Sequence, residues 1–174
     1  MSYDSHCDNC PYKNQIHLNT DKKIDRKSPP IELENNDSNT LLVFQAPGTE
    51  EWKVGKAIQP IIKPGGTAGR RIELSWKSVG KSREDFDIVN AVQCFPGNNG
   101  DRDLKPNSMS ICSCSNRLKD ILNGSSYTKI ILFGEIAQNV VDNLINTLSL
   151  DEVDVQRSKH PTGGLSKKDL DDLW

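Results

Sequence analysis

Strand-like and helix-like segments alternate along this 174-residue chain, and this alternation constrains its fold more than any other feature. Short apolar runs, typical of strands covered on both faces, lie at 40–45, 86–92 and 128–133, with a weaker one at 153–157. Apolar residues at helical spacing follow at 68–79, 111–122, 135–148 and 170–174. The pattern predicts a single α/β domain with three layers, in which a mainly parallel four-stranded sheet lies between helices.

Glycines and polar residues mark the boundaries of these segments. Gly80 and Gly124 end the first two predicted helices, where we expect the left-handed conformation that commonly terminates a helix. The segment 14–39 is polar and contains Pro29-Pro30. We therefore expect a long polar loop there, within one domain that spans residues 1–174.

The composition excludes a membrane-spanning protein. Hydrophobic residues make up 34% of the chain, and no run approaches the roughly 20 apolar residues that cross a bilayer. The first residues are polar, and no apolar signal-peptide region follows them. We expect a cytoplasmic, monomeric protein with no membrane partner.

Five cysteines suggest metal or redox chemistry, because disulfides are rare in a reducing compartment. Cys7 and Cys10 form a C-x-x-C pair, and Cys94 with a later cysteine completes a set of four. Four thiolates suit an iron-sulfur cluster or a structural zinc ion. Spacing alone leaves the metal open, and it leaves Cys112 and Cys114 as alternatives for the fourth ligand.

Positive charge is concentrated between Lys53 and Arg83, although the net charge of the chain is −2. This segment has eight basic residues and one acid, Glu73, a local balance of +7, and it includes Arg70 and Arg71. A local basic face suits a polyanion such as DNA. The same pattern also arises where lysines merely cover the solvated side of a helix and a loop.

Polar motifs stand where the predicted strands end. Gln45-Ala46-Pro47-Gly48 follows the first strand, Asn90 and Cys94-Phe95-Pro96-Gly97 the second, Gly134 the third, and His160-Pro161-Thr162-Gly163 the fourth. Ligands of open parallel sheets bind at the carboxyl ends of the strands. The sequence therefore predicts a ligand site at this edge.

Taken together, these motifs resemble the iron-sulfur uracil-DNA glycosylases of family 4. The resemblance rests, in chain order, on Cys7-Asp-Asn-Cys10-Pro11, Leu41 to Gly48, Gly66-Thr-Ala-Gly69, Asn90 to Cys94 with Pro96-Gly97-Asn98, Ile130 to Gly134, and His160-Pro-Thr162. It implies a monofunctional DNA glycosylase of DNA repair that hydrolyses the N-glycosidic bond of uracil, or of a modified pyrimidine, flipped out of DNA.

The resemblance also implies a role for individual residues. Asn90 would read the base through its amide, and His160 would donate a hydrogen bond to uracil O2 as charge moves onto the departing base. Ala46 and Pro64 would border the base. Thr162 and Gly163 would contact DNA phosphates, beside the basic segment with Arg70 and Arg71.

A 4Fe-4S cluster is the cofactor that the resemblance implies, with zinc as the alternative. Its ligands would be Cys7, Cys10, Cys94 and Cys114. We choose Cys114 over Cys112 because aligning on it keeps the apolar residues of its helix on the face where the family has them.

Three departures from the family pattern concern the pocket. Gln45 stands where the family has a glutamate, and an amide can orient water but cannot act as a general base. Pro64 stands near the position of a stacking aromatic residue, and the segment 99–106 is longer than usual. They leave two hypotheses, an active glycosylase with a remodelled pocket and a catalytically inactive DNA-binding module. Retention of Asn90 and His160 favours the first.

Overall fold

The computed structural model has a central parallel sheet at the position that the sequence predicts. It describes residues 5–13, 15–19, 24–27, 29–64, 66–100, 102–148, 150 and 152–174. The sheet has the strand order β4-β3-β7-β8, with every neighbouring pair parallel. Its strands are β3 (Thr40–Phe44), β4 (Asp87–Asn90), β7 (Lys129–Phe133) and β8 (Asp154–Ser158).

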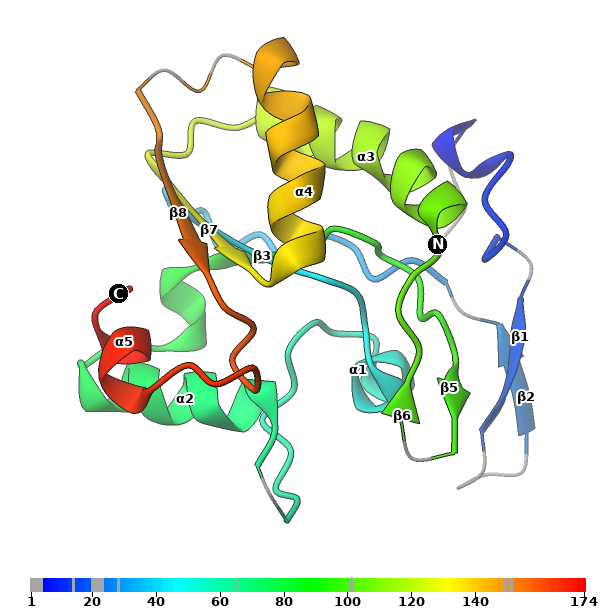
Figure 1. The fold of residues 1–174 in the computed structure, drawn as a ribbon, viewed down its shortest axis with the longest axis horizontal. Coiled ribbons are helices and arrows are strands. Elements are labelled where there is room, and N and C mark those ends of the chain that lie inside the picture. The colour runs from blue at the N-terminus through cyan, green and yellow to red at the C-terminus, as the bar shows by residue number, and fades with distance from the viewer. Residues whose placement is uncertain are drawn as a thin grey trace.

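Helices cover both faces of this sheet (Figure 1). One face carries α2 (Ala68–Ser78) and α5 (Lys167–Asp171), and the other carries α3 (Ser108–Asn123) and α4 (Glu135–Leu144). The predicted three-layer α/β/α fold is thereby confirmed. Among the described residues, no helix is long and apolar enough to cross a membrane.

Alternate residues of the strands supply the two halves of the core. In β3, Leu42 and Phe44 pack on the side of α2 with Trp76, whereas Leu41 and Val43 pack on the opposite side with helices α3 and α4. Successive side chains of a strand point to opposite faces, so one short apolar run serves both layers. Because the buried strands supply apolar side chains to both faces of the sheet, a chain with few apolar residues can form both halves of the core.

Several short elements were not predicted. They are α1 (Thr49–Val54), the antiparallel pairs β1 (Ile16–Asn19) with β2 (Ile24–Lys27) and β5 (Asn98–Asn99) with β6 (Arg102–Asp103), and the 3-10 helices η1 (Ser5–Cys7), η2 (Arg83–Asp85) and η3 (Ile145–Thr147). The segment 14–39 therefore contains a hairpin as well as loop. Its sequence alternates apolar and polar residues at Ile16-His-Leu-Asn19, a pattern that suits a strand.

The two helix-terminating glycines behave differently. Gly80 has φ 72°, as expected. The expectation for Gly124 was wrong, since its φ is −83°. Its amide donates to the carbonyl of Asp120 at 2.9 Å, so the last turn of α3 ends with an ordinary helical bond and no left-handed residue.

Candidate active site

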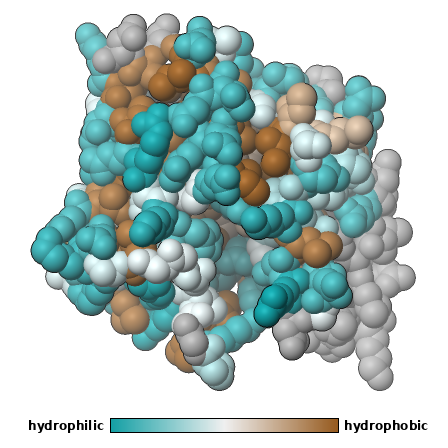
Figure 2. Space-filling view, viewed as in Figure 1, coloured by the Kyte–Doolittle hydropathy of each residue, from teal (hydrophilic) through white to brown (hydrophobic). Residues whose placement is uncertain are grey.

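The carboxyl edge of the sheet borders a cavity of about 320 Å³. The segments that follow β3 and β8 contribute to its wall, together with α1 and the loop before α2. Lining residues include Gln45, Ala46, Thr49, Asp103, His160 and Thr162. Figure 2 shows a mostly hydrophilic face that is hollowed between the α2 side and the side of the β5–β6 hairpin. The cavity thus brings together predicted residues from the first and fourth strands.

His160 lies two residues beyond β8 and borders the cavity. Its ring approaches the end of β7, where a Cβ added to Gly134 would stand 3.4 Å from the His160 Cβ. Gly134 has φ 85°, a conformation that side chains rarely adopt. A glycine at this position therefore lets the histidine pack closely against the sheet edge.

Thr162 determines which nitrogen of His160 carries the proton. The Thr162 hydroxyl lies 2.9 Å from Nδ1, and the Thr162 backbone amide donates to the same nitrogen at 3.4 Å. Because a backbone amide can only donate, Nδ1 accepts and Nε2 holds the hydrogen in the neutral ring. Burial lowers the pKa of His160 below its ordinary value of 6.5. Near neutral pH, His160 is consequently a neutral donor through Nε2.

Arg71 of α2 holds the loop that carries His160. Its guanidinium donates to the backbone carbonyls of Pro161 and Leu165. The loop is also fixed at its start, where Gln138 of α4 donates to the Ser158 carbonyl at 2.7 Å. Both contacts give His160 a defined position relative to two helices.

Two glycines permit close approach of the chain around the cavity. A Cβ on Gly69, in the first turn of α2, would stand 2.1 Å from the Gln59 carbonyl oxygen. A Cβ on Gly48, just before α1, would stand 2.5 Å from Asp103 Oδ2 and 2.9 Å from Glu51 Oε2. The wall formed by α1, the following loop and α2 therefore requires the absence of side chains at these two positions.

Asp103 is the cavity residue that sequence analysis missed. The β5–β6 hairpin carries it to the start of α1, where its Oδ1 accepts hydrogen bonds from the Thr49 amide at 3.1 Å and the Thr49 hydroxyl at 2.6 Å. The hairpin arises from the segment 99–106 that the sequence marked as unusually long. The sequence has Gly100-Asp101 between the paired residues Asn99 and Arg102, and a Gly-Asp pair is one of the two-residue signals for a hairpin.

Asn90 and Pro64 do not line the cavity. Asn90 ends β4 beside Phe44 of β3 and is only 2% exposed, and its side-chain nitrogen has no hydrogen-bond partner among the residues that the structure describes. Buried amides are normally paired, so an orphaned donor at this edge is unusual. Pro64 is exposed, and Ile61 and Lys63 of the same loop line the cavity instead.

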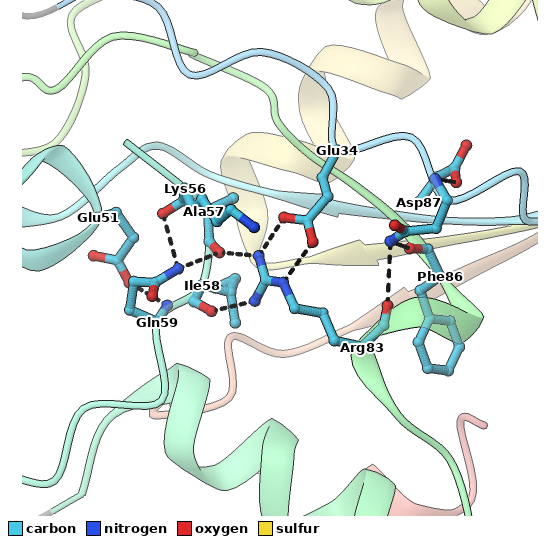
Figure 3. A network of polar contacts seen from close by, with 10 residues as sticks. Glu34, Glu51, Lys56, Ala57, Ile58, Gln59, Arg83, Phe86 and Asp87 are labelled. Carbon is cyan, nitrogen blue, oxygen red and sulfur yellow. Dashed lines mark hydrogen bonds and ion pairs between the residues drawn. The ribbon is translucent and has the colours of Figure 1, made fainter. Parts of the chain in front are cut away.

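Most cations of the basic segment already have partners. Lys53 and Lys63 pair with Glu50, Arg70 and Lys77 with Glu73, and Lys81 with Asp85. Arg83 binds both carboxylate oxygens of Glu34 and donates to the carbonyls of Ala57 and Ile58 (Figure 3). The acids lie mainly outside the segment 53–83, which is why the charge count alone overstated its free positive charge.

Four of the five cysteines share one buried cluster. Cys7, Cys10, Cys94 and Cys114 are each at most 7% exposed and pack with Tyr12 and Val92, whereas Cys112 is exposed. Burial raises the pKa of the Cys94 thiol, and it raises that of Cys114 to about 11. Ala46 packs against the same cluster, so the thiols lie directly behind the cavity wall.

The four thiols fit a shared thiolate-bound group in their number, burial and common location. Among the described residues, no group of three or more His, Cys, Asp or Glu side chains is arranged to hold a metal ion.

Fold and site together define an α/β protein with a histidine-bearing cavity at the carboxyl edge of its sheet and a buried set of cysteines beside it. No protein-family model matches the chain. A stretch of 112 residues, 64% of the chain, is 29% identical to the type-4 uracil-DNA glycosylase of Archaeoglobus fulgidus. It covers 51% of that protein, so the chain spans about half the length of this curated relative. The similarity supports a relationship to the uracil-DNA glycosylases.

Proposed function

We propose that this protein is a monofunctional DNA glycosylase that removes uracil or a modified pyrimidine from DNA and leaves an abasic site. The observation that carries the proposal is the cavity in which His160 stands as a neutral donor opposite the Gln45–Thr49 segment. Its volume of about 320 Å³ is at the small end of the range for ligand pockets, which suits a single flipped base. The similarity to a uracil-DNA glycosylase supports the same substrate class.

In this proposal, His160 and Asn90 read and activate the base. Nε2–H of His160 donates to the pyrimidine O2 and stabilises the negative charge that develops there as the glycosidic bond breaks. Asn90 does not line the cavity, so its amide nitrogen, which has no hydrogen-bond partner among the described residues, donates to the base after the base has displaced part of the cavity wall. Gln45 orients a water molecule, and Thr162 with Gly163 contacts the phosphate of the flipped nucleotide.

We also propose a 4Fe-4S cluster bound by Cys7, Cys10, Cys94 and Cys114. Such a cluster would serve as a covalent cross-link between segments and would take no part in base removal. The buried location of the four thiols beside Ala46 supports this assignment. The chain's own residues hold the N-terminal segment near the same place, because the His6 ring bonds the Asp120 carboxylate of α3 at 2.8 Å.

A base-release assay tests the function. The protein is incubated with single- and double-stranded oligonucleotides that carry one uracil or one modified pyrimidine, and alkali then cleaves any abasic sites. We expect cleavage at the modified position and none in a matched oligonucleotide with an ordinary pyrimidine there. Absence of product on every substrate, with DNA binding retained, would instead support the inactive DNA-binding module.

A further inference from the structure

We infer that Asp103, carried by the β5–β6 hairpin, is the general base that activates the attacking water in this cavity. The inference rests on the proposed glycosylase function and adds a residue to it. Asp103 lines the same cavity as His160 and Gln45 but comes from a separate element of the chain. An N-glycosidic bond is hydrolysed by water, and a carboxylate within reach of that water can accept its proton.

The local contacts hold the Asp103 carboxylate in one orientation. Both hydrogen bonds from Thr49 fall on Oδ1, at 3.1 Å and 2.6 Å, and Oδ2 has no partner among the described residues. Oδ2 occupies the space beside Gly48 that a Cβ would fill, because the two would be only 2.5 Å apart. One carboxylate oxygen is therefore anchored, and the other stays available at the turn that follows Gln45.

The other carboxylates of the cavity are engaged differently. Glu50 lies 2.9 Å from the Lys63 ammonium and 3.6 Å from that of Lys53, and the hydrogen bond from Lys63 holds the pKa of Glu50 below its ordinary value. A carboxylate stabilised by two ammonium groups is a weak proton acceptor. Glu51 accepts a hydrogen bond from the Gln59 amide at 3.0 Å and fixes the loop after α1. Asp103 has neither an ammonium partner nor such a link to that loop among the described residues.

The chemical step balances with water as the only co-reactant. The water oxygen forms a bond to C1′ of the deoxyribose while the C1′–N1 bond breaks. The electron pair of the C1′–N1 bond goes to the base. One proton of the water passes to Asp103 and then to solvent. The released base anion takes up a proton from solvent, so the products are an abasic sugar and a neutral base.

Asp103→Asn tests the inference, because asparagine keeps the acceptor for both Thr49 bonds and removes only the charge. We expect single-turnover base release to fall about 100-fold to 10,000-fold with unchanged DNA affinity and melting temperature. The matched control is Asp85→Asn. Asp85 also accepts bonds from a backbone amide and a serine hydroxyl, those of Ser82 at 2.7 Å and 3.2 Å, but lies outside the cavity, and we expect this variant to retain full activity.

Gly48→Ala supplies a second, independent variant. Its Cβ displaces the end of the Asp103 side chain, so activity should fall in the otherwise wild-type protein but little further in the Asp103→Asn background. If the wild-type protein releases the base and the Asp103→Asn variant does so at the same rate, the inference is overturned while the proposed function stands. A loss of base release in the Glu51→Gln variant, with none in Asp103→Asn, would also overturn it. If the wild-type protein releases no base at all, the proposed function itself fails.

Discussion

At the scale of single residues, the site depends on how neighbours fix protons and oxygens. The Thr162 amide makes Nδ1 of His160 an acceptor, so Nε2 carries the hydrogen in the neutral ring and is the donor. The Thr49 amide and hydroxyl do the same for one oxygen of Asp103. In both cases a threonine near a strand end or a helix start orients the group, because Thr162 lies four positions beyond β8 and Thr49 begins α1.

The half-buried His160 should make stability depend on pH. Because its pKa is lowered in the folded protein, the unfolded state binds a proton more readily as the pH falls through the ordinary value of 6.5. The folded state therefore loses stability below neutral pH. Chemical denaturation at about pH 7.5 and about pH 5.5 should show a smaller loss for His160→Gln than for the wild type. Identical losses for the two proteins would contradict a half-buried, neutral His160.

The sequence predicted some of these residues and not others for a physical reason. Gln45 and Ala46 follow the buried apolar strand β3, whose end can be recognised in the sequence, and His160 follows the weaker strand β8 at the same edge of the sheet. Asp103 lies in a polar segment without periodicity, and only the pairing of a two-residue hairpin brings it to Thr49. The sequence could not predict the partners of Arg71 either, because they are backbone carbonyls about 90 positions later in the chain.

At the scale of elements, the alternation of strands and helices was sufficient to predict the sheet and its covering layers. Apolar periodicity indicates burial, and β3, β4, β7 and the helices that cover them bury apolar side chains, whereas β8 contributes only the partly buried Val155. Helix α1 and the β5–β6 pair bury little and are held by hydrogen bonds and a single tryptophan, Trp52. Periodicity contains no signal for elements of that kind.

The contact between α2 and the His160 loop should matter for the rate of base release. Arg71→Met removes both bonds to the loop carbonyls, and the histidine then has a less defined position. We expect a rate loss of up to about 100-fold at saturating DNA, since a displacement of about 1 Å can cost that much. Lys168→Met is a suitable control, because it removes only the exposed ion pair between Lys168 of α5 and Asp172, the residue that follows this helix. Equal rates for the two variants would show that Arg71 does not position the loop.

At the scale of the whole molecule, the buried cysteines connect parts of the chain that the sheet does not. Cys7 and Cys10 come from the N-terminal segment, Cys94 from the loop after β4, and Cys114 from α3. A group bound by all four would join these segments behind the cavity. The predictions of a cytoplasmic location and a monomer stay predictions.

Iron content tests the proposed cluster. Protein purified without oxygen should be brown and contain about four iron atoms per chain. Cys114→Ala should lose the colour and most of the iron, whereas Cys112→Ala should keep both. Of these two cysteines, Cys114 lies in the buried cluster and Cys112 does not. A colourless protein with one zinc ion, or iron loss in the Cys112 variant, would contradict the assignment.

Single-turnover release of uracil from a duplex oligonucleotide, compared between the wild type and His160→Ala, tests whether His160 drives base removal. We expect the wild type to release uracil and the substitution to slow this reaction about 100-fold to 1,000-fold, the usual cost of losing one donor to a developing oxyanion. The melting temperatures of the two proteins should be similar at neutral pH. Equal rates for two folded proteins would contradict the role of His160 and, with it, the cavity as the site of base removal.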